Sequence, residues 1–133
     1  MSLERVNPAE LAPPSGFAHA VRASGTTRVH LAGQTALDAS GQVVGDGIVA
    51  QFEQALGNLL TALRVAGGAP GELASVTVYC VDLGDYRAHA RDLGEVWRRL
   101  VGRDYPAMAA VGVARLWDDA ALVEIQAVAE IAQ

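Results

Sequence analysis

Few side chains in this sequence can carry acid–base or nucleophilic chemistry, and Glu124 is the most informative of them. It stands between Val123 and Ile125 in an alternating apolar stretch, so a strand interior would have to bury its carboxylate. A buried carboxylate without a partner is costly, and the group therefore needs a raised pKa or a hydrogen-bonding partner. Two interpretations stay open: a catalytic acid–base group, or a structural glutamate that accepts backbone N–H bonds.

Two other reactive residues also have a functional and a structural interpretation. His19 can act as an acid or base in a cleft, or it can lie at the surface or in an interface. Cys80 lies in the middle of an apolar strand with no base beside it, which favours an inert core thiol over a nucleophile.

Several chemistries are excluded by residue types that the chain lacks. All ten basic residues are arginine, which removes Schiff-base catalysis and the P-loop lysine. The three histidines show no HExxH spacing, and one cysteine forms neither an internal disulfide nor a thiolate cluster, so we expect no metal and no cofactor. The net charge of −5, with no basic run longer than Arg98-Arg99, disfavours nucleic acid as a partner.

The length and composition fit one folded domain. The chain has 133 residues, of which 51% are hydrophobic and 19% are charged, and we expect a single domain over residues 1–133 with an N-terminal extension at 1–15. No apolar stretch approaches the roughly 20 residues that span a bilayer. Residues 1–14 carry three charges and no apolar leader, so we expect no membrane association and a cytoplasmic location.

Hydrophobic periodicity and turn signals predict the elements that position these residues. Strands are expected at 17–22 and 27–32 as a β-hairpin, then at 75–81, 107–116 and 121–132. Helices are expected from an N-cap at Asp46 to Gly67, and from a cap at Asp85 to Gly102. The order ββαβαββ predicts an α+β fold, a mixed β-sheet with two helices packed on one face, in which strands joined through a helix run parallel.

The last strand has two different faces. Alternate residues from Ala121 to Ile131 are apolar and suit the side beneath the helices, whereas the other side carries Leu122, Glu124, Gln126 and Val128. Two helices cannot also cover this second side. It is therefore either a subunit interface or a solvated sheet face.

Seven segments in order resemble the RidA/YjgF family of reactive intermediate deaminases, also known as endoribonuclease L-PSP. They are residues 16–21 (GFAHAV), 32–34 (AGQ), 54–59 (QALGNL), 81–86 (VDLGDY), 105–107 (YPA), 111–116 (VGVARL) and 123–129 (VEIQAVA). The resemblance implies a chorismate-mutase-like fold and a homotrimer with a central β-barrel. It also implies small-molecule ligands bound in clefts between the subunits.

The resemblance further implies which residues line such a cleft. Members carry an arginine two residues after the proline of the YPA segment, where it pairs with the carboxylate of an enamine or imine that is hydrolysed to a 2-keto acid and ammonia. That position is Met108 here. Glu124 corresponds to a glutamate that positions water, and Phe17 and Ala110 stand where members have tyrosine and cysteine.

Because a thioether cannot replace a guanidinium, we expect an altered substrate. The candidate substrate-binding residues are Phe17, His19, Gly33, Gln34, Arg91, Met108, Ala109 and Ala110, with Glu124 as the catalytic candidate. Arg91 either reaches a cleft or is a solvated helix arginine. Two functions stay open: a deaminase-like hydrolase acting on a C=N or enamine C–N bond without an arginine-held carboxylate, and a non-catalytic trimer that binds a metabolite or a partner.

Overall fold

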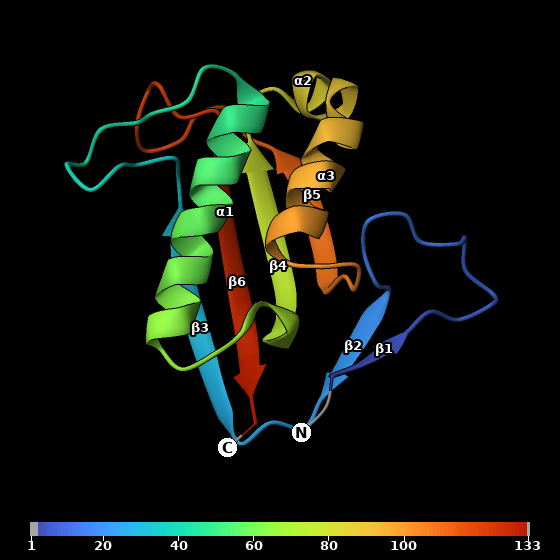
Figure 1. Cartoon of the computed structure of the whole chain (residues 1–133). Helices are drawn as coiled ribbons and strands as arrows, with labels where there is room; N and C mark the ends of the chain where they lie inside the picture. Colours follow the sequence, from blue (N-terminus) through green and yellow to red (C-terminus); the bar gives the residue numbers. More distant parts are fainter. Residues whose placement is uncertain (1–2, 133) are drawn as a thin grey trace.

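A four-stranded mixed sheet forms one layer of the fold, and helices cover one of its faces (Figure 1). The computed structural model describes residues 3–132. Its strands are β1 (Leu3–Val6), β2 (Ala20–Ala23), β3 (Thr27–Gln34), β4 (Leu73–Cys80), β5 (Ala107–Gly112) and β6 (Val123–Ile131). Its helices are α1 (Ile48–Val65), α2 (Leu83–Ala88) and α3 (Ala90–Leu100), with a short 3₁₀ turn at Pro70–Glu72.

The strand order β3-β6-β4-β5 confirms the predicted α+β class. β6 is antiparallel to both β3 and β4, and β4 is parallel to β5. Strands joined through a helix therefore run in the same direction, as the crossover argument requires. α1 joins β3 to β4, and α2 with α3 joins β4 to β5.

The core lies between the helices and the sheet. The face of α1 that repeats every three to four residues is buried, and Phe52, Leu56, Leu59 and Leu63 are at most 2% exposed. On β6, the residues from Val123 to Ile131 that were expected beneath the helices are buried, as predicted. Within residues 3–132, no helix covers the opposite face of the sheet (Figure 1).

The predicted hairpin between residues 17–22 and 27–32 is wrong. β2 pairs with β1 in a separate antiparallel ribbon, and β3 pairs with β6 instead. Between β2 and β3, a Cβ on Gly25 would lie 2.8 Å from the carbonyl oxygen of Ile131, so the chain passes too close to β6 for a side chain at this position. Periodicity identified β3 and only the second half of the strand predicted at 17–22, and it carries no information about which strand each one joins.

The helix starts also differ from the prediction. α1 begins after Gly47, whose φ is 95°, and Asp46 provides no side-chain cap. The second helical segment is capped by Asp82, whose carboxylate accepts a hydrogen bond from the Asp85 backbone N–H at 3.0 Å. The segment is then interrupted at His89, so one predicted helix is observed as two.

β5 ends at Gly112, four residues before the predicted end. The chain turns there, and the Val113 N–H donates to the carbonyl oxygen of Cys80 at 2.8 Å. The following loop is fixed by Gln51 of α1, a buried side chain that accepts a hydrogen bond from the Leu122 N–H and donates one to the Ala120 carbonyl oxygen. Because Gln51 provides hydrogen-bonding partners for these backbone groups, the loop does not need to pair as a continuation of β5.

None of the helices within residues 3–132 combines the length and the apolar character that a membrane crossing requires.

Candidate functional site

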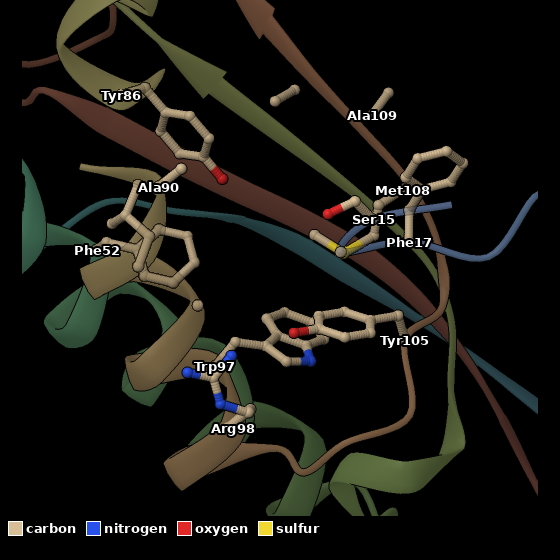
Figure 2. Close-up of a pocket in the computed structure, with 14 residues that line it drawn as sticks. Ser15, Phe17, Phe52, Tyr86, Ala90, Trp97, Arg98, Tyr105, Met108 and Ala109 are labelled. Carbon is tan, nitrogen blue, oxygen red and sulfur yellow. The ribbon is translucent and has the colours of Figure 1, made fainter. Parts of the chain in front are cut away.

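A half-open cavity lies between α3, β5 and the segment before β2 (Figure 2). Its volume is about 350 Å³, at the small end of the range typical of small-molecule sites. The residues that line it are Ser15, Gly16, Phe17, Phe52, Tyr86, Ala90, Leu93, Gly94, Trp97, Arg98, Tyr105, Met108, Ala109 and Ala110. The cavity is therefore mainly apolar and aromatic, with a few hydroxyl groups and one cation.

Strand register turns Met108 toward this cavity. Met108 lies opposite Val76 of β4, which is buried beneath the helices, so both side chains point to the helix-covered face of the sheet. Phe17 is brought beside them by the chain around Ala18, whose N–H donates to the Pro106 carbonyl oxygen at 2.9 Å and which bridges β5 at Ala107. Two segments about 90 residues apart thus form one wall.

Four further aromatic residues belong to the cavity wall: Phe52, Tyr86, Trp97 and Tyr105. Trp97 and Tyr105 are stacked, with ring centroids 5.7 Å apart and an interplanar angle of 13°. Tyr86 meets Phe52 edge to face at 6.2 Å, and its hydroxyl points into the space between α3 and β5 (Figure 2). Burial, and then the charge of the Cys80 thiolate, raises the pKa of Tyr86 to about 12. Its hydroxyl therefore stays protonated at neutral pH and can donate a hydrogen bond to a ligand.

Glu124 faces the other side of the sheet. It lies opposite Tyr79 on β4, and Tyr79 points to the other face of the sheet from Val76 and Met108. Its half-buried carboxylate rests on Gly33, where an added Cβ would stand 2.8 Å from Glu124 Cδ. The β3–β6 register shifts beside this contact, between Leu31 and Gln34, as in a β-bulge. Within one chain, the sheet separates Glu124 and Gly33 from Met108.

The other predicted site residues lie outside the cavity. His19 packs edge to face on Phe17, and its Nε2 is 2.8 Å from the Ala12 carbonyl oxygen, so it holds the N-terminal segment in place. Gln34 ends β3 opposite Ile125. Arg91 is exposed in the first turn of α3. The structure brings together Phe17, Met108, Ala109 and Ala110 at the cavity, whereas His19 contacts Phe17 from outside it.

Cys80 is buried, as the sequence predicts for a core thiol. Its Sγ donates a weak hydrogen bond to the Val111 carbonyl oxygen at 3.5 Å. Burial, and then the negative charge of Asp82, raises the pKa of the thiol, which keeps it protonated and unreactive at neutral pH.

Sequence reasoning missed eight side chains of the cavity wall: Ser15, Phe52, Tyr86, Ala90, Leu93, Trp97, Arg98 and Tyr105. A usable signal existed for two of them. Trp97 lies on the buried face of a helix that leads directly into the YPA segment, and Arg98 is its neighbour. Residues 3–132 contain no cluster of three or more histidine, cysteine, aspartate or glutamate side chains arranged to hold a metal ion.

The profile of the Endoribonuclease L-PSP family matches residues 8–131. The chain belongs to this family. This family, also called RidA/YjgF, includes a RutC family protein of Pyrococcus horikoshii, 33% identical over 118 residues that are 88% of each chain. A 2-iminobutanoate/2-iminopropanoate deaminase of Mus musculus is 33% identical over 92% of this chain and 84% of its own length. Among solved structures, the Rid-family protein YyfB of Yersinia pestis has a TM-score of 0.88 and 32% identity, with 98% of this chain and 100% of that chain covered.

Proposed function

We propose that this family member is a deaminase-like hydrolase of imines or enamines with an altered substrate. The main observation behind this proposal is that Met108, and not an arginine, points into the cavity beside Phe17. The relatives named as 2-iminobutanoate/2-iminopropanoate deaminases support the reaction class. A methionine there gives a carboxylate no counter-charge, so a small 2-imino acid loses the anchor implied by the family resemblance.

The proposed chemistry is addition of water across the C=N bond, followed by loss of ammonia to leave a carbonyl product. Glu124 is the proposed acid–base group, which takes a proton from the attacking water and returns one to the leaving nitrogen. The cavity wall itself holds no carboxylate and no histidine. Glu124 therefore has to reach the substrate from outside the cavity formed by its own chain.

Assembly into a homotrimer is the proposed way in which this happens. The uncovered sheet face carries Leu122 and Val128, both half-buried in a single chain, together with Glu124. In a trimer with this face turned inward as a central β-barrel, a cleft between subunits can combine the cavity of one copy with residues of another. Static light scattering should give a trimer mass at micromolar concentration. Val128→Asp should lower that mass, because an unpaired charge would be buried at the interface.

The test of the reaction uses 2-iminopropanoate generated in situ, with its loss followed through semicarbazone formation. The wild type should turn it over poorly, and Met108→Arg should gain activity because a guanidinium restores the carboxylate anchor. Met108→Leu is the matched control and should gain nothing. Adding Glu124→Gln to Met108→Arg should abolish the gain. Wild-type turnover as fast as that of the arginine-bearing deaminases would refute the argument from Met108.

A second candidate function, a non-catalytic trimer that binds a metabolite or a partner, is supported by the separation of Glu124 from the cavity. It predicts ligand binding without turnover in the wild type and in every variant above. An endoribonuclease role, which the family description names, is not favoured, because a chain with a net charge of −5 offers little attraction to a phosphate backbone.

A further inference from the structure

Arg98 is the single charged side chain in the cavity wall, and no acidic residue accompanies it. It lies on α3, one residue after Trp97, and across the cavity from Met108 on β5 (Figure 2). Its guanidinium folds back along the helix over Gly94, where an added Cβ would stand 3.3 Å from Nη1. The absence of a side chain at residue 94 therefore leaves room for the guanidinium at the rim of the cavity.

This guanidinium has no internal partner within residues 3–132. The neighbouring Arg99 is paired with Glu53 of α1, with Nη2 and Oε1 2.9 Å apart, whereas Arg98 has neither an ion pair nor a hydrogen bond with any described residue. An arginine keeps its charge at all relevant pH values and presents a planar fork of donors that matches a carboxylate. The cavity thus offers one free cationic fork.

The walls around that fork suit an apolar group of modest size. Trp97 and Tyr105 form a stacked aromatic surface next to Arg98, and Met108 and Phe17 close the opposite side (Figure 2). A ligand whose negative charge sits at Arg98 would direct its apolar part toward Met108. A methionine is suited to this place, because its flexible thioether packs well against irregular apolar and aromatic groups.

We infer that the cavity binds a monocarboxylate with an aromatic body, with the carboxylate held by Arg98 and the ring packed between the Trp97–Tyr105 stack and Met108. The inference rests on the proposed function for the identity of the site, and it adds the class of substrate. Relative to an arginine at position 108, the positive charge has moved from the strand to the helix. The bound molecule is accordingly reversed, with its ring toward Met108.

The test measures binding with molecules that cannot react, so its outcome is independent of turnover. The probe is 3-phenylpropanoate, compared with the neutral 3-phenylpropanamide and with propanoate, which lacks the ring. Trp117 is 94% exposed and outside the cavity, so Trp117→Phe leaves Trp97 as the one tryptophan and its fluorescence as the reporter. We expect saturable quenching by 3-phenylpropanoate, with the amide and propanoate each weaker by about tenfold or more.

Arg98→Gln, in the same Trp117→Phe background, should weaken 3-phenylpropanoate by about tenfold and leave the affinity for the amide unchanged. Arg98→Lys keeps the positive charge but lacks the planar fork of donors. Its affinity for 3-phenylpropanoate should therefore lie between those of the parent and of Arg98→Gln. Arg99→Gln is the matched control and should bind as the parent does, because Arg99 is paired with Glu53 away from the cavity. Equal affinity for acid and amide, an unchanged Arg98→Gln variant, or no binding of 3-phenylpropanoate at millimolar concentration would each overturn the inference. If this binding pattern holds while neither the wild type nor Met108→Arg turns over substrate, the non-catalytic candidate is favoured over the hydrolase and the ligand class stands.

Discussion

The contact between Gly33 and Glu124 leads to a quantitative prediction about coupling between two strands. A Cβ at residue 33 would lie 2.8 Å from Glu124 Cδ and 3.0 Å from Cγ, which is closer than ordinary van der Waals contact. Gly33 does not have a positive φ, so alanine brings no backbone strain. In Gly33→Ala the Glu124 side chain must therefore leave its observed position.

Two opposing terms set the magnitude. Forcing a side chain away from a favourable rotamer costs about 0.5–1.5 kcal/mol. Replacing glycine by alanine in an unstrained conformation stabilises a protein by about 0.4–1 kcal/mol, through the unfolded chain. Gly33→Ala should therefore leave the free energy of unfolding nearly unchanged in the wild-type background. In a Glu124→Ala background, where nothing has to move, the same change should stabilise the protein by about 0.4–1 kcal/mol.

The assay is a double-mutant cycle by urea denaturation at one fixed protein concentration, because oligomerisation makes apparent stability depend on concentration. The control is Gly57→Ala in α1, where an added Cβ meets open space, and it should stabilise both backgrounds equally, by about 0.5–1 kcal/mol. If Gly33→Ala proves additive with Glu124→Ala to within about 0.3 kcal/mol, the carboxylate does not rest on Gly33 and the described geometry is wrong.

The remaining predictions concern Tyr86 and the helix caps. Because the pKa of Tyr86 is raised from 10.0 to about 12, the unfolded chain loses this proton first, and the free energy of unfolding should fall between these two pH values. The expected fall in the free energy of unfolding is on the order of 2 kcal/mol. In Tyr86→Phe, denaturation curves measured across this pH range should show a smaller fall. An unchanged dependence of the free energy of unfolding on pH would contradict the burial argument. Asp82→Ala should lower the free energy of unfolding by about 1 kcal/mol, whereas Asp46→Ala should leave it nearly unchanged. Thermal denaturation distinguishes these, and equal losses in both variants would show that Asp82 is not the cap.

The fold class could be predicted from the sequence, because it depends on the spacing of hydrophobic residues and on the order of helices and strands along the chain. The alternation of β6 and the three-to-four spacing of α1 predicted which residues are buried, and the structure agrees. Strand partners depend on contacts between residues far apart in sequence, which no local pattern contains. β2 consequently joined β1 against the prediction, and Asp82, in place of Asp85, satisfied the helix start.

The candidate site was predictable only where a motif marks it. Met108 and Phe17 were found through the family resemblance, and register places both at one cavity. Arg98 carries no motif. Its relevance depends on the missing side chain at Gly94 and on Arg99 having Glu53 as a partner, and these facts exist only in three dimensions. For Glu124, the alternation of side chains along β6 correctly predicts a position on the uncovered face of the sheet. This alternation carries no information about Met108, which lies on another strand and faces the helices.

The central place of β6 has a consequence for biosynthesis. β3 and β4 do not pair with each other, and each has β6 as a neighbour, although β6 is the last strand to be translated. Until residue 131 has left the ribosome, both earlier strands present free hydrogen-bonding edges, and α1 has only part of the surface on which it packs. Until β6 is made, the nascent chain therefore exposes strand edges that are open to pairing with other chains. A chain terminated before β6 would leave β3 without a strand partner and β4 paired with β5 alone.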